Sequence, residues 1–265
     1  LELIHLNQST QGRPVFWFHG GLGGGEVYQQ LAQEIERPFY TIQARGWMTK
    51  RAPLHGIQAM ASYYSHIIQS VQPEGPYDLG GYSLGGAIAY EVTRQLQELG
   101  QIVDTIVMLD SLDSKTIKKM DFDDKSNILA IVNNLIFTEM IEDPERALKM
   151  IHRDEVNLDL NKEEFSKELI KIAKERGLTK PEKQLRSLLR MHYEIQNSYE
   201  ADKFSVLPLS NPQAVACYYF RNKSRLLFGE LEPFFYVKPD YANLAKIKYW
   251  MEWKQQLRNF HVMDV

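Results

Sequence analysis

The sequence has 265 residues, of which 44% are hydrophobic and 25% are charged, and its formal net charge is −3. A chain of this length and composition fits one generous α/β domain of a globular protein. The small negative charge gives no electrostatic argument for binding nucleic acid or an anionic membrane. A single cysteine, Cys217, excludes an internal disulfide.

The start and the hydropathy of the chain set further expectations. The sequence begins at Leu1 rather than at methionine, which suggests a segment of a longer protein. It contains neither a secretory leader nor an apolar run of about 18 residues, so we expect no membrane span and a cytoplasmic location.

Strand-like and helix-like patterns alternate from the N-terminus to residue 109. An alternating edge strand over Leu1–Leu6 is followed by a continuous apolar run over Pro14–Phe18, which is typical of a parallel strand buried on both faces. The next predicted elements are a strand over Phe39–Gln43, a helix over Ile57–Val71, the end of a strand at Tyr77–Leu79, a helix over Ala87–Leu96 and a strand over Ile102–Leu109. This order predicts a mostly parallel sheet with right-handed crossovers.

The segment 80–86 contains Gly81-x-Ser83-x-Gly85 between a predicted strand and a predicted helix. In a nucleophile elbow, serine occupies a sharp, strained turn, and glycine is needed two residues before and after it because a Cβ would collide with the neighbouring chain. The turn exposes the hydroxyl and aims the next backbone N–H, that of Leu84, at the oxygen of the attacked carbonyl. The motif alone is weak, but its position favours Ser83 as a nucleophile over a simple glycine-rich turn.

A second glycine-rich loop, His19–Gly25, follows the predicted strand over Pro14–Phe18. It lacks the lysine of a phosphate-binding P-loop and does not match the dinucleotide-binding fingerprint. Paired with a downstream elbow, it resembles the lipase-type loop that supplies the second oxyanion-hole N–H. We assign that N–H to Gly21, with Leu22 as the neighbouring alternative, and interpret His19 as a positional loop residue rather than a base.

Residues 115–201 show helical periodicity and no convincing strand. Their apolar residues form three stripes, with charged residues on the opposite faces. We predict an inserted helical lid over an apolar chamber, the alternative being that these helices are ordinary core. Strand character returns over Ala214–Phe220, followed by a helix over Leu244–Leu257 and a final strand over Phe260–Val265.

The segment from Gln72 through the elbow to Glu91 resembles the thioesterase domains that end polyketide synthases and nonribosomal peptide synthetases. Gln43–Gly46 and Val107–Ser111 also match the pattern of that family. The likeness spans the whole chain and is tight from Arg13 to Ser111.

The resemblance implies a single α/β-hydrolase domain over residues 1–265 that cleaves an acyl thioester without a metal or diffusible cofactor. A polyketide or peptide acyl chain would arrive on the phosphopantetheine arm of an upstream carrier domain and form an ester with Ser83. It would then leave by hydrolysis or by macrocyclisation. Two backbone N–H groups that point at the oxyanion are important, because the loss of one such donor typically lowers the catalytic rate by about 10²–10³-fold. The sequence leaves open whether the protein forms a homodimer.

The family pattern places the acid of the triad after the strand that follows the nucleophile helix, where Asp110 stands. An unpaired carboxylate at the end of an apolar strand is costly unless it has a function. Asp113 could belong to the same turn. Many α/β-hydrolases carry the acid after the strand that follows the lid, where Glu230, Glu232 and Asp240 lie. Asp110 is our preferred candidate.

The histidine of the triad departs from the family pattern, which is a Gly-x-His loop just after the final strand. The only late histidine, His261, lies inside the predicted final strand and has no glycine before it. We therefore expect the catalytic base beyond Val265 and keep His261 as the alternative. His152 and His192 fall in the predicted lid and are weaker candidates. Without a base, serine at its ordinary pKa is a poor nucleophile.

Two other functions stay open. One is a stand-alone, proofreading (type II) thioesterase or an esterase of the same fold, which fusion to a carrier domain would distinguish. The other is a non-catalytic acyl-binding module, against which covalent modification of the serine by an active-site phosphonate would argue.

Overall fold

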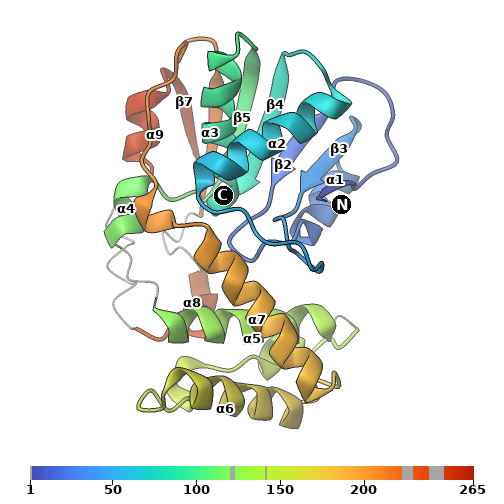
Figure 1. Cartoon of the computed structure of the whole chain (residues 1–265), viewed down its shortest axis with the longest axis vertical. Coiled ribbons are helices and arrows are strands. Elements are labelled where there is room, and N and C mark those ends of the chain that lie inside the picture. Colours follow the sequence, from blue (N-terminus) through green and yellow to red (C-terminus); the bar gives the residue numbers. More distant parts are fainter. Residues whose placement is uncertain (1, 120–122, 141, 223–228, 239–247) are drawn as a thin grey trace. The chain divides into compact units, whose positions relative to one another are not determined.

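The computed structural model describes residues 2–119, 123–140, 142–222, 229–238 and 248–265 (Figure 1). The chain divides into two compact units. Unit 1 combines residues 1–120, 195–223 and 248–265, and unit 2 combines residues 121–194 and 224–247. Every strand that the structure describes belongs to unit 1, whereas the described elements of unit 2 are helical.

Unit 1 is built on a seven-stranded sheet with the order β1-β3-β2-β4-β5-β6-β7. Its strands are β1 (Leu3–His5), β2 (Val15–Phe18), β3 (Phe39–Ile42), β4 (Tyr77–Tyr82), β5 (Val103–Leu109), β6 (Ala216–Arg221) and β7 (Asn259–Asp264). Strand β1 pairs antiparallel with β3, and the other pairings are parallel. The predicted mostly parallel sheet is confirmed. The strand order changes direction at β2, so the loops after β2 and β4 flank the crevice where such sheets bind ligands.

Helices cover both faces of this sheet. The helical elements of unit 1 are η1 (Glu26–Tyr28), α1 (Gln29–Gln33), α2 (Ile57–Val71), α3 (Leu84–Glu98), α4 (Ser114–Lys119), η4 (Ala201–Lys203) and α9 (Met251–Gln256). Ala32 of α1 packs with Val15 and Trp17 on one face. On the other face, Tyr64 of α2 stacks on Phe18 with ring centroids 5.9 Å apart. Alternate residues of β2 therefore face opposite helical layers, which explains its unbroken apolar sequence.

Unit 2 consists of α5 (Asp124–Glu139), η2 (Arg146–Lys149), η3 (Arg153–Glu155), α6 (Lys162–Glu175), the first part of α7 (Glu182–Ser198), η5 (Gly229–Leu231) and α8 (Glu232–Phe235). Buried Asn133 of α5 ties distant segments together. Its amide nitrogen donates to the carbonyls of Ile151 and Phe234 at 2.8 and 2.6 Å, and its amide oxygen accepts from the Ile151 N–H at 2.6 Å. This side chain therefore links a segment after β6 to the unit formed mainly by residues 121–194.

Most predicted elements differ by a few residues at their ends, and two differ more. The edge strand is shorter than Leu1–Leu6, and the helix predicted over Leu244–Leu257 is α9, which begins at Met251. Residues 248–250 precede it as coil and turn, and residues 244–247 lie outside the described part of the chain. The interpretation of residues 115–201 as a lid over an active site remains a prediction.

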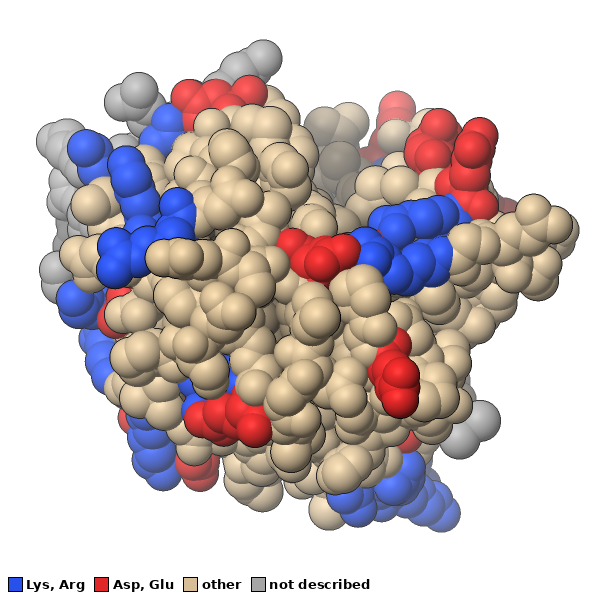
Figure 2. Space-filling model, turned by 90° about the horizontal axis from the view of Figure 1, so that it is seen from above, with Lys and Arg blue, Asp and Glu red and all other residues tan. Residues whose placement is uncertain are grey.

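Charged residues are dispersed on the face of the molecule that Figure 2 shows. Lys and Arg side chains form separate groups there, with Asp and Glu side chains beside them. Among the described residues, no helix has the length and apolar character needed to cross a bilayer.

Candidate active site

Ser83 lies at the junction of β4 and α3 with φ 53° and ψ −119°, a strained backbone conformation for a residue with a side chain. The flanking glycines are required sterically. A Cβ on Gly81 would lie 2.2 Å from the Gly85 carbonyl carbon, and a Cβ on Gly85 would lie 2.3 Å from the Phe18 oxygen. The segment therefore has the geometry of a nucleophile elbow.

Asp110 occupies the corresponding position one strand further along the sheet. The Ser83 N–H donates to the carbonyl of Leu109, the last residue of β5, at 2.8 Å. The Asp110 N–H donates to the carbonyl of Phe220 on β6 at 2.9 Å, and Asp110 also has a positive φ of 43°. Both side chains thus leave the sheet at the carboxyl ends of adjacent parallel strands.

The Asp110 carboxyl group is held through one of its two oxygens. Oδ1 accepts hydrogen bonds from the Tyr249 hydroxyl at 2.8 Å and from the Asn222 N–H at 3.1 Å. Oδ2 accepts none from the described residues. Burial raises the pKa of Asp110, although these two donors and the charge of Arg221 act in the opposite direction. A fixed, partly buried carboxylate can accept an imidazole N–H on the oxygen to which no described residue donates.

The alternative acids are placed differently. Asp113 accepts the N–H groups of Thr116 at 2.8 Å and of Glu252 at 3.1 Å, so its two oxygens bind backbone in the first turns of α4 and α9. Glu232 forms an ion pair with Arg153 within unit 2, and Glu230 lies in η5 of the same unit. Asp240 lies outside the described residues.

The two candidate oxyanion donors begin the segments that follow β4 and β2. Leu84 is the first residue of α3, where backbone N–H groups lack partners within the helix. Gly21 lies in the loop after β2, and a Cβ built on it would meet nothing within 4 Å. Leu22, the alternative donor, is its neighbour. The open space beside Gly21 is compatible with a substrate approaching its backbone.

A tyrosine that the sequence analysis did not single out connects these two segments. The Tyr28 hydroxyl donates to the Phe18 carbonyl at 2.6 Å and accepts the Tyr82 N–H at 2.8 Å. Tyr28 is 2% exposed, and burial raises its pKa, so the hydroxyl stays protonated. It joins the last residue of β2 to the last residue of β4, directly before the loop and the elbow. No motif marks it, because its role depends on tertiary contacts.

The histidines occupy other places. His261 lies within β7, exposed, with its ring stacked on Tyr218 at 5.2 Å and Nε2 2.6 Å from Asn259 Oδ1. His152 caps η3 in unit 2, and His192 is buried on α7 in the same unit. Among the described residues, no imidazole hydrogen-bonds the Ser83 hydroxyl, and no cluster of three or more His, Cys, Asp or Glu could hold a metal ion.

Comparison with known proteins gives consistent results. A profile of the Thioesterase domain family matches residues 13–200 of the chain. The chain is 50% identical over 264 residues to Polyketide synthase PksR of Bacillus subtilis (strain 168), covering 100% of this chain and 10% of PksR. It thus spans only a small part of the curated relatives that it matches.

Solved structures share the fold at lower identity. The four-domain nonribosomal peptide synthetase AB3403, bound to AMP and glycine, matches with a TM-score of 0.69 and 22% identity over 100% of this chain and 18% of that one. The Vlm2 thioesterase domain matches with a TM-score of 0.59 and 17% identity over 100% of this chain and 88% of that one. These likenesses confirm the α/β-hydrolase fold.

Proposed function

The chain belongs to the Thioesterase domain family, and we propose that it releases a polyketide or peptide acyl chain from a carrier-bound thioester through an ester on Ser83. The observation that carries this proposal is the placement of Ser83 and Asp110. They follow paired ends of adjacent parallel strands, each with positive φ and each with its N–H bonded to the next strand.

In this mechanism a base takes the Ser83 proton as Oγ attacks the thioester carbonyl carbon. The N–H groups of Leu84 and Gly21 receive the oxyanion, and the C–S bond then breaks while the base returns the proton to the departing thiolate. Water, or a hydroxyl or amine of the acyl chain itself, attacks the resulting ester by the same route in reverse. The proposed chemistry uses only side chains and backbone groups, so it requires no metal or diffusible cofactor.

We propose that the base is a histidine that follows Val265 in the longer protein. Two hydrogen bonds support this position. The peptide between Arg221 and Asn222 donates its N–H to Asp110 Oδ1 at 3.1 Å and accepts the Val265 N–H on its carbonyl at 2.9 Å. Because the N–H and the C=O of this peptide point in opposite directions, β6 lies between Asp110 and Val265, and the chain after Val265 would continue from the same carboxyl-end edge of the sheet at which Asp110 lies. His261, stacked on Tyr218 within β7, is the weaker alternative.

The partner that fits this reaction is an upstream carrier domain bearing a phosphopantetheine arm. Full-length identity to a segment of a polyketide synthase favours a domain fused to its synthase over a stand-alone proofreading enzyme. We propose that the helices within residues 115–201 act as a lid that receives the acyl chain. Hydrogen exchange in the full-length protein tests the lid, because bound acyl ligand should protect these helices more than the central strands.

Steady-state kinetics of the full-length protein test the function. We expect acyl release to be faster when the thioester is carried on the protein's own carrier domain than on a free pantetheine mimic at the same concentration. Release from both should stop in Ser83→Ala. Equal rates for the two donors would favour the stand-alone alternative. A Ser83→Ala variant that still released product would contradict the acyl-serine mechanism.

A further inference from the structure

We propose that His19 and Tyr64 form a buried hydrogen-bond relay that sets the orientation of the Gly20–Gly21 peptide, and thereby aims the Gly21 N–H at the oxyanion. This inference rests on the proposed function, because it assigns positioning residues to that reaction. The relay consists of two contacts. His19 Nδ1 lies 2.8 Å from the Gly20 carbonyl oxygen, and His19 Nε2 lies 2.8 Å from the Tyr64 hydroxyl.

The chemistry of the partners decides which group donates. A carbonyl oxygen can only accept, so Nδ1 carries the imidazole proton and donates it to Gly20. A neutral imidazole has one N–H, so Nε2 accepts from the Tyr64 O–H. The ring is fully buried, and burial lowers the pKa of His19 to about 4, which keeps it neutral at pH 7. The relay therefore runs in one direction, from Tyr64 through His19 to Gly20.

The planar trans peptide transmits this contact to the site. The C=O of Gly20 and the N–H of Gly21 belong to one peptide group and point in opposite directions. The carbonyl is held by His19 and also by the Gly23 N–H at 3.1 Å. The Gly21 N–H must then point away from the imidazole. Apart from Gly21 and its two chain neighbours, no described residue has an atom within 4 Å of a Cβ built on Gly21, which leaves room for a substrate beside this peptide.

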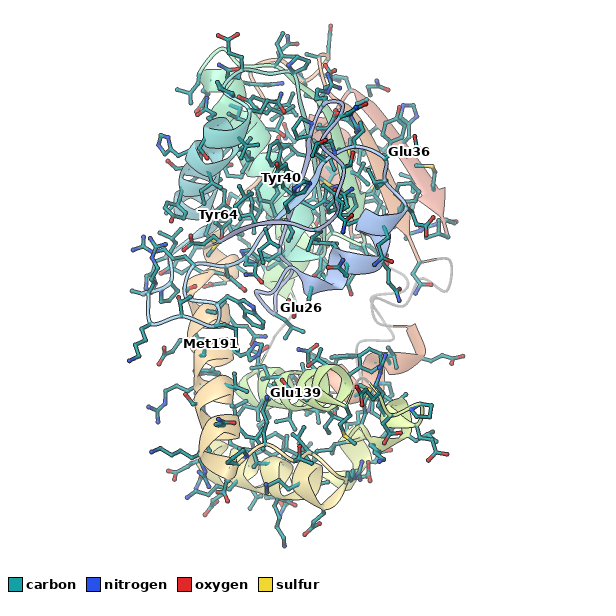
Figure 3. All side chains as sticks on the ribbon, turned by 90° about the vertical axis from the view of Figure 1, so that its right-hand side faces the viewer. Glu26, Glu36, Tyr40, Tyr64, Glu139 and Met191 are labelled. Atoms are coloured by element: carbon teal, nitrogen blue, oxygen red, sulfur yellow. The ribbon has the colours of Figure 1, made fainter. Side chains whose placement is uncertain are left out.

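The relay is anchored at both ends. Tyr64, labelled in Figure 3, is 1% exposed on α2, and its hydroxyl also hydrogen-bonds the backbone of Arg45, shortly after β3. The backbone N–H of His19 donates to the Ile42 carbonyl of β3 at 3.0 Å. Neither end can move without breaking buried contacts, so the hydrogen-bond donor is fixed before substrate binds, as electrostatic stabilisation of a transition state requires.

Tyr199 provides a matched control. Its ring stacks on the same imidazole with centroids 5.7 Å apart, and it is 4% exposed. Its buried hydroxyl has no hydrogen-bond partner among the described residues. Tyr64→Phe and Tyr199→Phe therefore each delete one buried hydroxyl beside His19, but only Tyr64→Phe breaks the relay.

The test uses the full-length protein, an acyl thioester of N-acetylcysteamine as substrate and an alkyl boronic acid as a probe of the tetrahedral oxyanion. We expect Tyr64→Phe to lower kcat/KM about tenfold and to weaken boronate binding by the same factor, because the donor is misaimed rather than removed. Tyr199→Phe should stay within about twofold of the wild type on both measures. His19→Asn, whose amide can still donate to Gly20, should retain more activity than His19→Leu.

The outcomes separate the relay from the mechanism on which it rests. Equal effects of Tyr64→Phe and Tyr199→Phe would overturn the relay, as would a loss of kcat/KM in Tyr64→Phe without weaker boronate binding. Thermal unfolding of both variants controls for misfolding, and Tyr64→Phe keeps the test valid if His19→Leu does not fold. A wild-type protein that fails to acylate Ser83 would instead overturn the proposed function, and the relay with it.

Discussion

Ser83 and Asp110 are structural equivalents on neighbouring strands. Each is the first residue after its strand, each has a positive φ, of 53° and 43°, and each donates its N–H to a carbonyl of the next strand. Leu109 and Phe220, which accept these hydrogen bonds, are themselves register partners in β5 and β6. The same backbone conformation after two adjacent strands thus places the proposed nucleophile and the proposed acid at the same edge of the sheet.

The elbow should not tolerate a Cβ at Gly85. We expect Gly85→Ala to lower the free energy of unfolding by about 1–3 kcal/mol, because the new methyl group would lie 2.3 Å from the Phe18 oxygen. Gly21→Ala is the control, since its methyl group would contact nothing within 4 Å and should change stability by less than about 0.5 kcal/mol. Urea unfolding compares the two, and equal losses would contradict the close packing of Gly85 against β2.

The role of Asp110 predicts opposite effects on activity and stability. Asp110→Asn should lower kcat by about 10⁴-fold, because an amide cannot orient the imidazole and stabilise its charged form. The free energy of unfolding at pH 7 should be unchanged or higher, because burial raises the pKa of Asp110 and so opposes its ionised form. Loss of stability together with full activity would identify Asp110 as a structural residue.

Tyr249→Phe offers a finer test of the same carboxyl group. The Tyr249 hydroxyl donates to Oδ1 at 2.8 Å and thereby favours the ionised form. Its removal should raise the pKa of Asp110 further, so activity should be lost at a higher pH as the solution is acidified. A pH–rate profile of kcat/KM whose acid limb does not move upward would argue against this contact.

The sequence predicts much of this arrangement, because the elbow and the alternation of strands and helices follow from local patterns, whereas the choice of Asp110 follows from the resemblance to the thioesterase family. The Gly-x-Ser-x-Gly spacing predicts the elbow, because only glycine fits sterically on either side of the serine. Continuous runs of apolar residues predict the buried strands. The contacts of Tyr28, Tyr64 and Tyr249 could not be predicted, since each joins segments far apart in the chain and no spacing encodes them. The composition of unit 2 could not be predicted for the same reason, because Asn133 hydrogen-bonds the carbonyl of Phe234, about a hundred positions further along the chain.

Folding stability should depend on pH through His19. Burial lowers its pKa from an ordinary value of 6.5 to about 4. Between these values the unfolded chain binds a proton that the folded chain does not, so this contribution is fully present above about pH 6.5 and is lost as the pH falls. Urea titrations at about pH 7 and pH 5 should show a smaller loss of unfolding free energy in His19→Asn than in the wild type. An unaltered loss in His19→Asn would refute this assignment.

The proposed function depends above all on Ser83 carrying the acyl chain, which intact-protein mass spectrometry can detect. Full-length wild-type protein incubated with an acyl thioester should gain the mass of one acyl group, and peptide mapping should place it on Ser83. The His261→Gln variant should form the same adduct, because His261 lies within β7 and stacks on Tyr218. Ser83→Ala should gain no mass. An acyl adduct on another residue, or an acylated Ser83→Ala variant, would contradict the acyl-serine mechanism.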